Sequence, residues 1–237
     1  MKRIKVFLIL LSLVGCSAVS FGQHAEVKAR VELLHNGRRL RNASNAVIWL
    51  TPIGVVALDP PTQTTIPRLE QKNKAFHPSL VVVPVGGKVE FPNHDPFFHN
   101  VFSLYEGKRF DLHLYESGAA PVVRFDRVGV SYIFCNIHPQ MSAVVVALST
   151  PYYGISGTNG EITIANVPPG RYEMHVFHAS AASADLSSYS HEIRVGDGML
   201  SLGDFRLHQD DLLATHKNKY GLDYDPPSPD SPEYTRP

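Results

Sequence analysis

Hydrophobic residues in this chain fall in short runs, some alternating with polar residues and some continuous, and turn residues separate the runs. Runs of this kind bounded by Gly, Pro, Asn and Asp are typical of β-strands, and strands about ten residues apart are typical of a sandwich or barrel. Helical periodicity is almost absent after Ala25. The pattern predicts an all-β protein with strands near 27–33, 46–50, 80–85, 88–91, 122–125, 130–134, 143–148, 161–164, 172–177, 192–195 and 199–207.

The first residues have the pattern of an export signal, in which basic residues precede a short apolar run at 6–14. The run is too short to span a bilayer. Ordinary cleavage after Gly22 makes 1–22 the signal peptide, whereas Leu-Val-Gly-Cys ending at Cys16 resembles a lipobox, which is cut before the cysteine and leaves it lipidated. A third interpretation keeps the segment attached as an apolar helix. We therefore expect an exported, periplasmic protein, with a lipid anchor at Cys16 as the alternative form.

Composition narrows the class of protein. Basic and acidic side chains number 22 each, so a nucleic-acid partner held by a basic face is not expected. The hydrophobic fraction of 43% is enough for one large core or two smaller ones. Removal of 1–22 leaves 19 basic against 22 acidic side chains, a net charge of −3. The same cut leaves one thiol, Cys135, and an exported protein with a free thiol needs something that protects it from oxidation.

Side chains able to bind a metal gather in the stretch Cys-Asn-Ile-His-Pro-Gln-Met. An apolar strand delivers Cys135 to one end of the expected sandwich, and a compact loop presents His138 and Met141 before the next strand begins. A thiolate, an imidazole and a thioether favour copper over hard cations, because copper prefers soft donors. A second imidazole is expected from elsewhere in the chain, and His99, which follows two phenylalanines, is the candidate.

The motif Cys-x-x-His-Pro-x-Met, with a His-Asn pair whose histidine lies 36 residues before the cysteine, resembles the ligand motifs of the cupredoxins, the plastocyanin-like and amicyanin-like blue copper proteins. The resemblance covers roughly 75–148 and implies a Greek-key β-sandwich domain over 68–149 that holds one type 1 copper. It implies that Asn100 ties its segment to the cysteine loop by hydrogen bonds. The copper ligands that it implies are His99, Cys135 and His138 in a plane, with Met141 as the weak axial ligand.

The same residues have other interpretations. Cys135 at the end of an apolar strand could be a small buried hydrophobe, and a methionine such as Met141 is more often core than ligand. Cys135 and His138 could form a nucleophile and its base, but no oxyanion motif accompanies them. Zinc could use the same residues, although a thioether is a poor zinc ligand.

A second resemblance lies downstream of the copper motif. Residues 158–174, with a Gly turn, a strand, Pro-Pro-Gly and a Tyr-bearing strand, are similar to the second half of carboxypeptidase regulatory-like, transthyretin-like sandwich domains. The first half of that pattern appears at 36–50. We therefore expect 25–58 and 150–207 to form one small β-sandwich, a structural or docking module, with the copper domain inserted between its halves. The alternative is that 25–58 supplies the opening strands of the cupredoxin sheet.

The C-terminal segment has a different composition. Residues 209–237 hold five of the 18 prolines and few apolar side chains. A segment with so little to bury is expected to be disordered or only loosely docked.

These observations predict an exported type 1 copper protein that carries single electrons between redox partners, and not an enzyme. The expected partner is a redox protein of unknown identity, which meets an apolar edge made by Ile137, Pro139 and one of Phe97 and Phe98. One alternative function is periplasmic copper binding and handling without electron transfer. The other is a structural β-sandwich that acts as a binding module.

Overall fold

The computed structural model describes residues 24–54, 62–104, 107–210 and 216–224. In these residues the chain forms the strands β1 to β17 and one short helix, α1 (Ser183–Ser188), so the all-β prediction is confirmed. Each strand predicted from the sequence corresponds to a strand of the structure. The expected signal peptide, including Cys16, lies outside the described residues. Among the described residues, no helix has the length and apolar character needed to cross a membrane.

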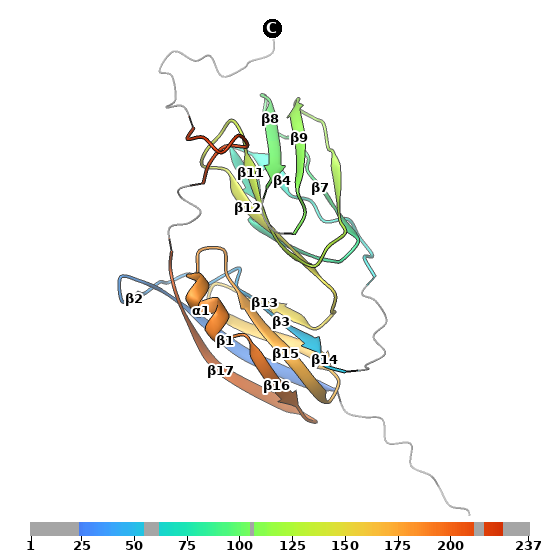
Figure 1. The fold of residues 1–237 in the computed structure, drawn as a ribbon, viewed down its shortest axis with the longest axis vertical. Coiled ribbons are helices and arrows are strands. Elements are labelled where there is room, and N and C mark those ends of the chain that lie inside the picture. Colours follow the sequence, from blue (N-terminus) through green and yellow to red (C-terminus); the bar gives the residue numbers. More distant parts are fainter. Residues whose placement is uncertain (1–23, 55–61, 105–106, 211–215, 225–237) are drawn as a thin grey trace, which may run out of the picture.

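One β-sandwich is built from strands near both ends of the described chain (Figure 1). In its first sheet β1 pairs with β14 and the short β2 on one side and with β17 on the other, and in its second sheet the order is β13-β3-β15-β16. In both sheets, strands from the N-terminal part of the described chain pair with strands that follow residue 150, and 55–58 lie outside the described residues. The strands are β1 (Ala25–His35), β2 (Arg38–Arg39), β3 (Val47–Pro52), β13 (Tyr153–Ile155), β14 (Glu161–Val167), β15 (Gly170–Phe177), β16 (His191–Val195) and β17 (Met199–His208).

The segment between the two halves forms a second sandwich. Its largest sheet has the order β6-β12-β11-β8-β9, and β10-β7 and β4-β5 form two smaller sheets. Four of its strands, β4, β5, β8 and β9, were not among those predicted from the sequence, and β4 and β5 carry mostly polar residues. The strands are β4 (Glu70–Lys72), β5 (Ala75–His77), β6 (Leu80–Pro84), β7 (Gly87–Glu90), β8 (His99–Ser103), β9 (Phe110–Tyr115), β10 (Val122–Phe125), β11 (Gly129–Cys135) and β12 (Ser142–Leu148).

Strand β12 contributes to two apolar cores because its side chains alternate between the two faces of the sheet. Val145 packs into the core of its own sandwich, with Ala143 and Ala147 on the same face. The opposite face carries Val144, Val146 and Leu148, which pack with residues of the first sandwich such as Phe177. A strand buried on both faces needs a continuous apolar run, and this explains the sequence of β12.

Part of the C-terminal segment makes contacts with the inserted sandwich. Residues 216–224 lie against the inserted sandwich beside β11, where Figure 1 shows them in red. The ring of His216 stacks on that of Phe134, with centroids 4.1 Å apart. Aromatic stacking and hydrogen bonds hold this part of the segment, although its composition gives no sign of a core. The remaining parts, 211–215 and 225–237, lie outside the described residues.

Candidate metal centre

The metal-ligand candidates meet where β8 begins and β11 ends. Strand β11 delivers Cys135 opposite Val101 of β8, so that His99, at the start of β8, lies close to the cysteine. Two hydrogen bonds close the loop that follows: the Met141 N–H donates to the His138 carbonyl, at 3.0 Å, and the Cys135 N–H donates to the Met141 carbonyl, at 3.3 Å. This short loop turns His138 back toward the cysteine.

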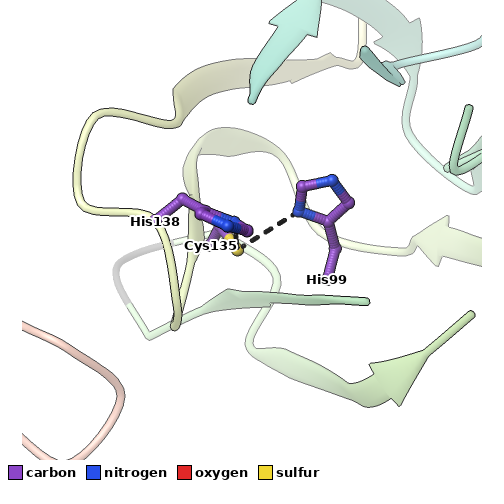
Figure 2. Close-up of side chains that lie close together, drawn as sticks. All are labelled: His99, Cys135 and His138. Atoms are coloured by element: carbon purple, nitrogen blue, oxygen red, sulfur yellow. Dashed lines mark hydrogen bonds between the residues drawn. The ribbon is translucent and has the colours of Figure 1, made fainter. Parts of the chain in front are cut away.

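The three side chains point toward one another, as Figure 2 shows. Cys135 Sγ lies 3.6 Å from His99 Nδ1 and 3.6 Å from His138 Nδ1. One ligand atom from each residue lies within 4.8 Å of the other two. His99 and Cys135 are fully buried, whereas His138 is half-buried at the edge of the site.

This geometry fits one metal ion. Bonds of about 2.3 Å to sulfur and about 2.0 Å to nitrogen, at tetrahedral or trigonal angles, separate the two donor atoms by about 3.5–3.7 Å. Both sulfur-to-nitrogen distances in the structure, 3.6 Å, lie in that range. The donor set of one thiol and two imidazoles favours a soft or borderline transition metal, and copper is the metal that it fits best.

The surroundings of Cys135 act on its thiol in two directions. Burial raises the thiol pKa, whereas the backbone N–H groups of Asn100, Ile137 and His138, which point at the sulfur, lower it, and the net shift is upward. The N–H groups favour the thiolate, but they do not offset the lost hydration. A cation bound at this position would supply the missing stabilisation of the thiolate.

Asp95, which the sequence analysis did not single out, orients His99. His99 Nε2 lies 2.9 Å from Asp95 Oδ2, and the buried carboxylate also accepts the N–H groups of Asn73, at 2.6 Å, and Lys74, at 3.0 Å. Burial raises the pKa of Asp95, but hydrogen bonds, first from the Lys74 N–H and then from His99, hold it below its usual value. A carboxylate at Nε2 places the imidazole proton there and leaves the Nδ1 lone pair facing Cys135. The only sign in the sequence is an acidic residue four positions before a histidine.

Asn100 contacts the cysteine loop through its main chain. Its carbonyl accepts the N–H of Asn136, at 2.9 Å, and its own N–H points at the Cys135 sulfur. Its side chain turns the other way, and its Nδ2 donates to Asp111 Oδ1, at 2.6 Å. The histidine-bearing and cysteine-bearing segments are therefore joined by hydrogen bonds beside the ligands.

The remaining predicted residues lie around this centre. Met141 is fully buried and belongs to the apolar cluster that includes Cys135. The Phe97 ring packs 5.4 Å from the ring centroids of both His99 and His138. Its neighbour Phe98 is 38% exposed. Of the two phenylalanines, one therefore contacts the ligand imidazoles and the other faces outward, as expected for neighbours in an extended segment.

The chain has partial likenesses to solved structures. No protein-family model matches it, and no curated protein matches it. A copper-containing nitrite reductase from Thermus scotoductus SA-01 is 22% identical over 42% of this chain and 26% of its own, with a TM-score of 0.35. A purple cupredoxin from Nitrosopumilus maritimus is 22% identical over 35% of this chain and 99% of its own, with a TM-score of 0.32. Amicyanin from Paracoccus versutus is 19% identical over 37% of this chain and 85% of its own, also at 0.32.

The matched part of this chain spans about a quarter of the nitrite reductase, 26%. With TM-scores of 0.32 to 0.35, these likenesses are too low to support a conclusion about the fold or the function of this chain. The ligand atoms, the distances between them and their burial are what point to copper at this site.

Proposed function

We propose that this protein is an exported type 1 copper protein that carries single electrons between redox partners. The observation that carries the proposal is a buried cysteine whose sulfur lies 3.6 Å from the Nδ1 atoms of two histidines. His99, Cys135 and His138 would hold the ion, and Met141 would be the weak fourth ligand. Copper bound there would supply a centre that alternates between Cu(I) and Cu(II).

The protein's own residues restrict movement of the ligands. Cys135 is fixed at the end of β11, and His99 is held by Asp95 on its far side. The hydrogen bond from Asn136 to Asn100 joins the two ligand segments. A ligand set whose geometry changes little when the ion changes oxidation state favours rapid electron transfer, because the ligands need little reorganisation during the step.

Burial of the ligands favours electron transfer over copper delivery. A protein that hands on its metal needs ligands that a partner can reach, whereas His99 and Cys135 are fully buried. His138 is half-buried, and it is the ligand through which we expect electrons to pass to a partner. The expected partner is another redox protein, and the apolar surroundings of His138 suit a brief contact.

We also propose that the protein works outside the cytoplasm. The supporting observations are the basic and apolar pattern of 1–22 and the free thiol of Cys135, which a bound metal would protect from oxidation. Cys16 is the alternative site of lipid attachment. Mass spectrometry of the processed N-terminus distinguishes a chain that begins at Gln23 from one that begins with a lipidated Cys16.

Addition of Cu(II) to the purified protein tests the copper assignment. We expect an intense blue colour from charge transfer between the Cys135 thiolate and Cu(II). Cys135→Ser should abolish the colour and leave the circular dichroism of the β-sandwiches unchanged. Cys16→Ser in the full chain is the matched control, and it should stay blue. A wild-type protein that binds Cu(II) and remains colourless would show that the type 1 assignment is wrong.

A further inference from the structure

Residues 216–224 make direct hydrogen bonds to the loop that carries the cysteine. The Tyr224 hydroxyl donates to the Cys135 carbonyl, at 2.9 Å. The backbone N–H of Lys219 donates to Asn136 Oδ1, also at 2.9 Å. The segment therefore reaches the candidate ligand Cys135 and the residue that follows it.

A second set of contacts closes a ring of hydrogen bonds. Lys219 Nζ lies 2.8 Å from Asp111 Oδ2, and the other oxygen of Asp111 accepts Asn100 Nδ2, at 2.6 Å. The Asn100 carbonyl accepts the N–H of Asn136, whose side chain in turn accepts the N–H of Lys219. The ring of Lys219, Asp111, Asn100 and Asn136 thus joins the C-terminal segment to both ligand-bearing segments.

The ion pair within this ring is sheltered from solvent. The exposed fractions of the Lys219 and Asp111 side chains are 15% and 28%. The hydrogen bond with Asp111 raises the pKa of Lys219. Burial raises the pKa of Asp111, but hydrogen bonds, chiefly from Lys219, bring it below its usual value. A partly buried pair that is also hydrogen-bonded to neutral partners is stronger than an exposed ion pair.

The segment has its own local structure, which holds Lys219 in position. Asn218 Oδ1 accepts the N–H groups of Tyr220, at 2.9 Å, and Leu222, at 3.1 Å. The Asn218 N–H donates to the Leu222 carbonyl, at 2.9 Å, and Gly221 adopts a φ of 78°, which glycine tolerates well. The result is a compact turn with Lys219 directed toward the sandwich.

Aromatic rings attach the segment to the outer face of β11. His216 stacks on Phe134, and the Tyr224 ring meets His216 edge-on, with centroids 5.3 Å apart. Phe134 and Cys135 are neighbours in β11, so their side chains face opposite sides of the sheet. The segment therefore covers the back of the strand whose last residue is the candidate ligand.

From these contacts we propose that residues 216–224 form a C-terminal strap that positions the cysteine loop and its bond to the Asn100 segment. Lys219 and Tyr224 are positioning residues, which act on the metal centre through Asn136 and the Cys135 carbonyl. The strap holds the ligand loop in its metal-binding conformation before the metal arrives, and it keeps Asn100 N–H directed at the sulfur. The effect on a copper ion rests on the proposed function, whereas the effect on the loop does not.

The proposal is tested in the metal-free full chain with Tyr224→Phe and Lys219→Met. We expect the amides of Cys135 and Asn136 to exchange with deuterium about fivefold faster in each variant, because one hydrogen bond contributes ~1 kcal/mol net. Lys219→Arg should restore much of the protection, because it keeps the positive charge that pairs with Asp111. Tyr153→Phe and Lys72→Met are the matched controls, since both alter side chains of other strands, and they should leave the exchange unchanged.

The copper-loaded variants allow a second measurement, of the charge-transfer band and the reduction potential, which a general loss of stability would leave unchanged. Tyr224→Phe should shift the thiolate charge-transfer band and the reduction potential, because the hydrogen bonds around Cys135 change with its loop. If the amide exchange rates of Cys135 and Asn136 are unchanged in both Tyr224→Phe and Lys219→Met, the strap proposal is wrong. A wild type without the blue band would instead contradict the proposed copper function, and the metal-free exchange rates would still decide the strap.

Discussion

Opposing effects on the Cys135 thiol explain why a metal belongs at this position. Burial raises the thiol pKa, and three backbone N–H groups only partly offset it. An isolated buried cysteine would be a neutral thiol, but this one faces the Nδ1 atoms of two imidazoles. Burial also lowers the pKa of His99, so its imidazole is neutral and able to bind a metal, and Asp95 only partly opposes this shift. His99 is thus in the neutral state that a metal ligand requires, whereas Cys135 must lose its proton when a metal binds.

The role of Met141 is decided by a substitution that conserves volume. Met141→Leu should keep the blue colour, because the thiolate remains, and should raise the reduction potential, because the weak thioether donor that favours Cu(II) is lost. The expected loss of stability is below about 1.5 kcal/mol. Cyclic voltammetry measures the potential, and Met199→Leu, at an exposed position, is the control. An unchanged potential would remove Met141 from the ligand set.

Two elements, β12 and the turn before β14, show how packing restricts the residues that the chain can carry at a position. β12 carries an apolar run because both of its faces are buried, one in each core. The turn before β14 places Gly160 against β1, where its carbonyl accepts the Val31 N–H, at 2.8 Å. A Cβ on Gly160 would lie 2.0 Å from the Val31 carbonyl oxygen, and φ there is 79°. Only glycine satisfies both conditions.

Gly160→Ala should therefore destabilise the first sandwich strongly. We expect a loss of about 3–4 kcal/mol in the free energy of unfolding, from the left-handed backbone and from the clash with Val31. Gly203→Ala is the matched control, because φ is also 79° but the space around a Cβ is open. It should cost only about 1–2 kcal/mol. Urea unfolding monitored by circular dichroism measures both, and equal losses would show that the clash contributes nothing.

At the scale of the whole molecule, the two sandwiches share an apolar junction and the metal centre lies in the inserted one. The junction is formed by Val47, Leu80, Val144, Val146, Leu148 and Phe177. Because β12 belongs to both cores, unfolding of either sandwich exposes apolar residues of the other. The candidate ligands are on β8, on β11 and in the loop before β12, so the centre is coupled to this junction through the strand that follows it.

A charge at the edge of the centre should slow electron transfer. Phe98, which precedes His99 in the chain, is 38% exposed. Phe98→Lys should lower the rate of electron self-exchange between two copies of the protein about tenfold. A charge buried in an apolar contact between the copies would cost ~1.4 kcal/mol, which corresponds to that factor. Leu104→Lys is the matched control, because Leu104 is 41% exposed but follows the opposite end of β8. NMR line broadening of mixed oxidation states measures the rate.

Salt provides an independent check on this apolar edge. The expected mature charge of −3 is too small to govern encounter between copies, so the wild-type self-exchange rate should vary little with ionic strength. A rate that Phe98→Lys leaves unchanged, or a steep salt dependence of the wild type, would place the electron exit elsewhere.

The sequence by itself determined the parts of this protein that depend on neighbours in the chain. Short apolar runs and turn residues located the main strands, because pleat and turn chemistry are local. The spacing of Cys135, His138 and Met141 placed them in one loop, since a few residues between two strands leave little freedom. His99 was found from its aromatic and Asn neighbours and from the resemblance to cupredoxins.

Only the tertiary structure showed the long-range contacts that no motif marks. It brought Asp95 to His99, both faces of β12 into separate cores, and Lys219 and Tyr224 to the cysteine loop. A proline-rich tail and a lone aspartate have no hydrophobic period to mark their partners. Their contacts are individual hydrogen bonds and ring stacks, which form only after packing has placed both groups side by side.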